Sequence, residues 1–144
     1  MTAAGLHVRA RQLLEQGNTL SALAMFEKIP EPERSAAVLS GYAVCIAAER
    51  GQIEEGIRLC RDAIRQNGSD PFHYLNLGRI YLKAGQKNDA LLAWREGMAA
   101  TRSEELRTML ETLGTRRPPL FPSLPRRHIL NRWLGLLLSK FGIR

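Results

Sequence analysis

The sequence is poor in cysteine, in aromatic residues and in long hydrophobic runs. Its 144 residues include two cysteines, too few for a disulfide framework, which indicates a reducing compartment. Aromatic residues make up only 6%, but hydrophobic residues make up 44%, which excludes wholesale disorder. Charged side chains interrupt residues 1–20, so no secretory signal is expected, and the apolar run over residues 133–139 is too short to cross a bilayer. We therefore expect a soluble, cytoplasmic protein of one or two domains.

Acidic residues are absent from the C-terminal part of the chain. Residues 1–111 hold 14 basic and 14 acidic side chains, whereas residues 112–144 hold seven basic ones and no acidic one. The formal net charge of +7 therefore arises in this tail. A neutral body and a basic tail call for separate interpretations.

Period-two alternation of polar and apolar residues is also absent from the body, and the apolar residues follow helical spacing instead. Gly17, Gly51 and Gly85 are separated by 34 residues each time, and each lies between two helical segments. A helix, a turn and a second helix repeated every 34 residues is the period of the tetratricopeptide repeat, and the body resembles that family.

The third unit, residues 71–104, carries the resemblance most clearly. It reads Tyr74-x-x-Leu77-Gly78-x-x-Tyr81 and then Ala90-x-x-x-Trp94. The small residues at 78 and 90 let the two helices of the repeat approach closely, and the aromatic side chains fill the gaps between neighbouring helices. We expect Gly85 to end the first helix in a left-handed conformation and Trp94 to lie in the core.

The resemblance implies an all-α, right-handed solenoid. Its predicted parts are three repeats (residues 3–36, 37–70 and 71–104), a capping helix (105–114), a proline-rich extended linker (115–126) and a basic amphipathic helix (127–144). A capping box between Thr101 and Glu104 is expected to open the capping helix.

In this family the first helix of each repeat lines a concave groove. By that analogy a mostly apolar groove suited to a peptide or an amphipathic helix is lined by His7, Arg11, Leu14, Val38, Tyr42, Cys45, Phe72, Leu75, Asn76, Arg79, Leu82 and Lys83. One subset of the family grips the terminal carboxylate of chaperone tails. The matching positions here are 7, 11, 42, 72 and 76, and none carries the expected residue, so a carboxylate clamp is not predicted.

Residue types with catalytic or metal-binding chemistry are scattered. The three histidines, at 7, 73 and 128, have no metal-ligand spacing, and neither a nucleophile elbow nor a phosphate-binding loop is present. We expect no catalysis, no cofactor and no metal. The sequence favours a small adaptor of bacterial type that binds a protein or peptide.

The tail carries apolar anchors that a plain linker would lack. They are Leu120, Phe121 and Leu124 in the linker, and Ile129, Leu130, Trp133, Leu134, Leu137 and Phe141 in the predicted helix. An apolar stripe of this size usually indicates a partner. Three remain open: the repeat array, in cis or within a homodimer; another protein; or an anionic membrane surface, which would make the protein a peripheral scaffold at the inner face of the membrane. Nucleic acid fits less well, because aliphatic residues dilute the basic ones.

Overall fold

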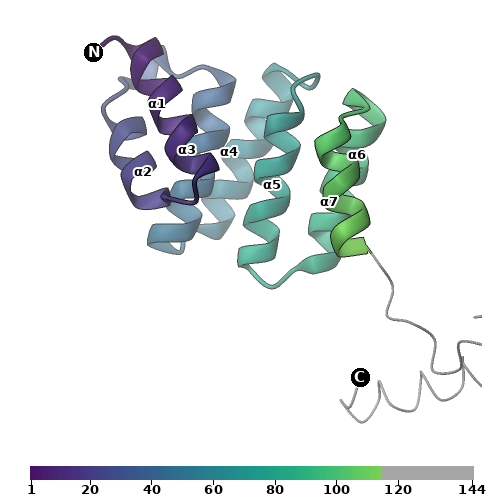
Figure 1. Cartoon of the computed structure of the whole chain (residues 1–144). Coiled ribbons are helices and arrows are strands. Elements are labelled where there is room, and N and C mark those ends of the chain that lie inside the picture. Colours follow the sequence, from purple (N-terminus) through teal and green to yellow (C-terminus); the bar gives the residue numbers. More distant parts are fainter. Residues whose placement is uncertain (115–144) are drawn as a thin grey trace, which may run out of the picture. The chain divides into compact units, whose positions relative to one another are not determined.

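Figure 1 shows the computed structural model, which describes residues 1–114. Within these residues the chain is helical and has no strand. The elements are α1 (Ala3–Glu15), α2 (Thr19–Glu27), a short 3-10 helix η1 (Glu31–Glu33), α3 (Ala36–Arg50), α4 (Ile53–Gln66), α5 (Pro71–Lys83), α6 (Lys87–Thr101) and α7 (Glu104–Gly114). The predicted linker, the terminal helix and their apolar anchors lie outside the described residues.

The ends of α1, α3 and α5 follow from local sequence. Each helix starts at a side-chain cap, where Thr2, Ser35 or Asp70 accepts a hydrogen bond from a backbone N–H of the first turn. Each ends one or two residues before a glycine of the 34-residue series, as the spacing predicts. The three glycines have φ values of 78°, 66° and 75°, a left-handed conformation that glycine adopts without strain.

The helices stack as consecutive pairs. The pairs α1–α2, α3–α4 and α5–α6 pack internally, while α3 also contacts α2 and α5, and α7 packs on α6. In Figure 1, α3 is recessed between α1 and α5. This arrangement is an α-solenoid, which confirms the all-α fold class predicted from the sequence.

Helix spacing, within the pair α5–α6 and between α2 and α3 of successive pairs, depends on rings packed directly against glycine. A Cβ atom on Gly78 would lie 2.0 Å from Nε1 of Trp94, and one on Gly41 would lie 2.5 Å from Cζ of Phe26. Both rings are fully buried. The indole N–H of Trp94 also donates to the backbone carbonyl of Leu75 at 3.5 Å. The close approach predicted at Gly78 is therefore confirmed, and Trp94 is a core residue.

The last helix covers the end of the described array. Leu106 of α7 is fully buried with Trp94, and the half-buried side chains of Met109, Leu110 and Leu113 pack against the same cluster. The remaining side chains of α7 are polar and exposed, apart from its terminal glycine. This pattern suits the capping role that the sequence predicts.

The predicted capping box between Thr101 and Glu104 is wrong. Thr101 is the last residue of α6, and its hydroxyl donates to the carbonyl of Gly97 at 2.7 Å. Arg102, with φ 53°, ends α6 in the left-handed region. The backbone carbonyl of Ser103 then accepts from the N–H of Arg107. Only two residues separate α6 from α7, so Thr101 belongs to the preceding helix.

We expect Trp94→Ala to lower the free energy of unfolding by about 3–5 kcal/mol, because removing a buried aromatic ring leaves a cavity. Leu92→Ala on the same helix is the matched control, since Leu92 is 54% exposed and its loss should cost less than about 1 kcal/mol. Chemical denaturation of both variants provides the measurement. Equal losses would contradict the packing described for α6.

Candidate functional site

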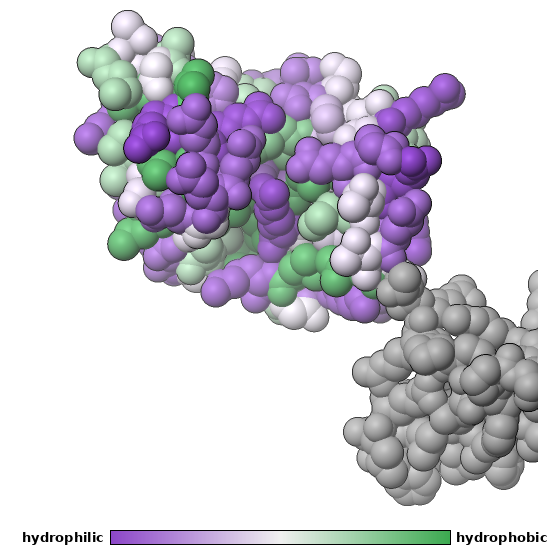
Figure 2. Space-filling model, in the orientation of Figure 1, coloured by the Kyte–Doolittle hydropathy of each residue, from purple (hydrophilic) through white to green (hydrophobic). Residues whose placement is uncertain are grey.

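The twelve residues predicted to line a groove divide by exposure. Leu14, Val38, Cys45, Phe72, Leu75 and Asn76 are buried; His7, Arg11, Tyr42, Arg79 and Leu82 are half-buried; Lys83 is exposed. Most of the apolar members therefore contribute to the core, and most of the accessible members are polar or basic. Figure 2 shows the same character: hydrophilic residues cover much of the surface over α1 and α5, with hydrophobic residues in narrower patches.

We call the surface along α1, α3 and α5 that carries His7, Arg11, Ala48, Arg79 and Lys83 the inner face. Its walls are α1 and α5, which lie on either side of the recessed α3 (Figure 1). The guanidinium carbon of Arg11 lies 4.1 Å from the centroid of the Phe72 ring, and Nε of Arg11 lies 3.3 Å from a carboxylate oxygen of Glu15. This cation–π contact joins α1 and α5, and Phe72 is only 4% exposed.

A buried polar network lies at the interface of α3 and α5. Ser40, His73 and Asn76 are all fully buried. The hydroxyl oxygen of Ser40 lies 2.9 Å from Nδ1 of His73, and Nδ2 of Asn76 donates to the same oxygen at 3.4 Å. The network reaches the inner face through Arg79, whose Nη1 donates to Oδ1 of Asn76 at 3.2 Å.

The environment disfavours the charged form of two imidazoles, that of His7 and that of the network residue His73. Burial lowers the pKa of His7 and of His73 below the ordinary value of 6.5, and the positive charge of Arg11 also lowers both, whereas Asp70 acts in the opposite direction. The Nε2 atom of each ring is buried and has no hydrogen-bond partner within residues 1–114. A proton added to either ring there would lack an acceptor.

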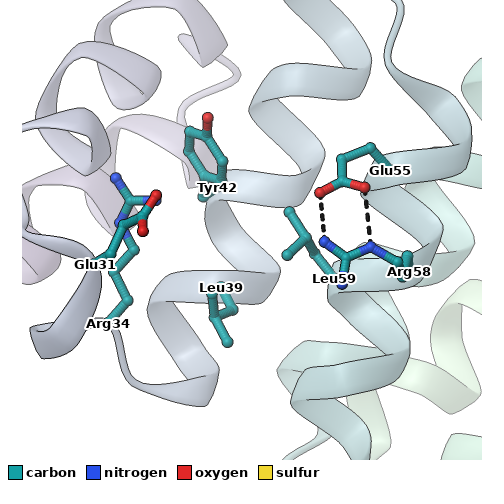
Figure 3. Close-up of a pocket in the computed structure, with 7 residues that line it drawn as sticks. All are labelled: Glu31, Arg34, Leu39, Tyr42, Glu55, Arg58 and Leu59. Carbon is teal, nitrogen blue, oxygen red and sulfur yellow. Dashed lines mark hydrogen bonds and ion pairs between the residues drawn. The ribbon is translucent and has the colours of Figure 1, made fainter.

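Tyr42 lies in a cleft that is separate from the contact between Arg11 and Phe72. This cleft of about 320 Å³ is lined by Glu31, Arg34, Leu39, Tyr42, Glu55, Arg58 and Leu59 (Figure 3). The guanidinium carbon of Arg34 lies 5.0 Å from the centroid of the Tyr42 ring, and Arg58 is paired with Glu55 and Asp62. Sequence reasoning missed this cleft, because its residues come from three elements with no shared motif.

The cysteines are not suited to nucleophilic chemistry. Both are free and fully buried, and burial raises the pKa of each thiol to about 12. In Cys45 the nearby charge of Glu49 acts in the same direction. Among residues 1–114 no group of histidine, cysteine and carboxylate side chains could hold a metal ion. The same residues include no helix long and apolar enough to cross a membrane.

We expect the free energy of unfolding to fall as the pH drops below about 6.5, the ordinary pKa of histidine. The folded-state pKa of His73 is lowered, so the unfolded chain binds the proton more readily. The stability is complete above that pH and is lost as the pH falls through the folded-state pKa. His73→Gln should make unfolding less sensitive to pH between about 7 and 5. Urea denaturation across this range gives the slopes, and identical slopes would contradict the burial of a neutral His73.

Comparison with known proteins identifies the repeat. The family model described as "Tetratricopeptide repeat" matches residues 59–91, which run from α4 through α5 into α6. No curated protein sequence matches the chain at a significant level.

Among solved structures, the chain is similar to the second TPR domain of the human RPAP3 protein, determined by NMR in complex with the HSP70 peptide SGPTIEEVD. The TM-score is 0.58 at 16% sequence identity, and the match covers 79% of this chain and 96% of that chain. At this identity the likeness shows the fold alone. With the repeat matched over residues 59–91, the glycine spacing and the stacked helix pairs, it supports a tetratricopeptide repeat fold for the described residues.

Proposed function

We propose that this chain is a non-catalytic adaptor whose inner face binds a peptide or a helix of a partner protein in the cytoplasm. The observation that carries the proposal is the inner face itself. Two helices that belong to different repeats flank a recessed third helix, and accessible polar side chains stand above a tightly packed core. Such a surface can hold an extended or helical segment between its walls. The similar RPAP3 domain, which was determined with a bound peptide, supports the same class of function.

The floor of the inner face is suited to close approach by a ligand backbone. Ala37 and Ala48 on α3 are half-buried and have side chains of a single carbon. Arg79 and Lys83 of α5 and Arg11 of α1 stand at the walls. A bound segment can therefore approach α3 while its side chains meet polar groups on both sides.

Ala48→Arg tests where the binding surface lies. Peptides of 12 residues would be selected from a random phage-displayed library on the full chain, and their affinities then measured by calorimetry. We expect Ala48→Arg to abolish their binding, because the new side chain fills the space above α3. Leu92→Arg is the matched control, since Leu92 is exposed on α6 and its substitution should leave the affinity unchanged. An empty selection, or a loss with Leu92→Arg alone, would overturn the proposal.

The basic tail suggests a second candidate function. Its seven positive charges and its predicted apolar stripe favour a peripheral scaffold that is anchored on anionic lipid by residues 127–144. The competing proposal places the tail on the repeat array, in cis or in a homodimer. Arg79 and Lys83 make the inner face a poor site for it, because charges of the same sign repel each other.

Removal of residues 115–144 distinguishes these two roles of the tail. An anchor predicts that only the full chain sediments with anionic vesicles, that salt weakens this binding, and that truncation leaves the melting temperature unchanged. A packed tail predicts that truncation lowers the melting temperature or changes the oligomeric state. Vesicle sedimentation at low and physiological salt, beside thermal melting of both chains, gives the answer.

A further inference from the structure

Arg79 is held on the inner face by buried side chains. Asn76 lies beneath it, fully buried, with its amide nitrogen bonded to Ser40 and its amide oxygen bonded to Arg79. Ser40 in turn contacts His73. A chain of hydrogen bonds therefore runs from the interface of α3 and α5 to a half-exposed guanidinium, and it fixes the position of one Nη atom. An arginine fixed in this way loses less conformational freedom when it binds an anion.

The charge of Arg79 is not neutralised by any carboxylate within residues 1–114. Within residues 1–114, Arg11, Arg50, Arg58, Arg61, Arg65 and Arg107 all form ion pairs with carboxylates. Arg79 forms none, and its printed partner is a neutral amide. Lys83, one turn further along α5, is exposed and also has no carboxylate partner among these residues.

The two cations lie on the same side of α5. Phe72, Asn76, Arg79 and Lys83 follow one another at intervals of four, three and four residues, which places them along one face of the helix. The ring of Phe72 meets Arg11 of α1, so this face is the one turned toward α1. Arg79 and Lys83 therefore point their charges along one wall of the inner face.

We infer that Arg79 and Lys83 recognise carboxylates of an acidic partner segment, with Arg79 as the oriented contact and Asn76 as its positioning residue. The inference rests on the proposed binding at the inner face and adds the charge of the partner. A guanidinium with one N–H engaged still has four donors for a carboxylate. Of the carboxylates on α1 and at the start of α5, that of Glu15 pairs with Arg11, and that of Asp70 accepts from the N–H of Phe72. The basic tail of this chain does not supply the carboxylates that this site would recognise, because residues 112–144 hold no acidic side chain.

The site differs from a carboxylate clamp in the residues that it uses. The positions compared with such a clamp are 7, 11, 42, 72 and 76. Two of them, Phe72 and Asn76, are buried here, and Tyr42 lies in the cleft of Figure 3. Positions 79 and 83 lie one and two helical turns after position 76 on α5. Recognition of internal Asp and Glu side chains, rather than of a single chain terminus, suits two cations one turn apart.

The test uses the full chain and two capped 12-residue probes, one of alternating Glu and Ala and one of alternating Gln and Ala. We expect the acidic probe to bind, the neutral probe to bind at least tenfold more weakly, and Arg79→Gln to weaken the acidic probe about tenfold. Lys83→Gln should weaken it about threefold, since an exposed lysine contributes less. Arg95→Gln is the matched control, because Arg95 is an exposed arginine of α6 without an ion pair. NMR titration gives both the affinities and the residues that shift.

Two further variants separate orientation from charge. Arg79→Lys keeps the charge but not the planar fork, and Asn76→Ala keeps Arg79 but removes its support; each should weaken the acidic probe about threefold or more. Circular dichroism tests whether Asn76→Ala stays folded. If that variant unfolds, the affinity of Arg79→Lys alone decides whether the orientation of the guanidinium contributes to binding. Equal effects of Arg79→Gln and Arg95→Gln, or wild-type affinity in Arg79→Lys, would overturn the inference.

The peptides selected from the phage-displayed library distinguish this inference from the proposed function. Library peptides that lose binding to Ala48→Arg but bind Arg79→Gln normally would overturn the acidic partner and leave inner-face binding intact. Peptides indifferent to Ala48→Arg would overturn inner-face binding itself. We expect the selected sequences to be enriched in Asp and Glu.

Discussion

Rings packed directly against glycine set the spacing on which the rest of the array depends. Gly78 lies under the indole of Trp94, and Gly41 lies under the ring of Phe26, with no room for a Cβ atom at either place. Because a ring fills the interval between two helix backbones, the helices can neither approach further nor slide without a clash. The positions of α5 and α6, and through them of α7, follow from this contact.

The interface between the second and third repeats combines this apolar packing with a polar network. Burying Ser40, His73 and Asn76 has a cost in desolvation, which the hydrogen bonds among them offset. Directional bonds of this kind restrict the register in which α3 and α5 can pack, whereas methyl groups alone would tolerate several registers. The network also fixes the position of a side chain at the surface, because its last member is the half-exposed Arg79.

Residues 1–111 have a net charge of zero, but ion pairs are unevenly distributed among their basic side chains. Acidic and basic residues are equal in number over residues 1–111, yet most arginines are paired locally along or between helices. Arg79 and Lys83, the cations of α5 on the inner face, have no such partner within residues 1–114. A partner that brings carboxylates gains from both charges, whereas the basic tail is repelled by them.

The sequence by itself determined the repeat unit, the turns and the core of the third repeat. A 34-residue glycine spacing and the pattern from Tyr74 to Trp94 are local signals, and they hold because a left-handed turn and a close helix crossing each demand particular residue types. Only the tertiary structure decided which groove positions stay accessible. Phe72, Asn76 and Cys45 have the spacing of exposed residues but are buried. For Phe72 and Asn76 the reason is contact between helices: Arg11 of α1 covers Phe72, and Ser40 of α3 reaches Asn76. Helical periodicity gives the direction of a side chain, whereas its exposure depends on residues distant in the sequence, so no pattern within one repeat could reveal it.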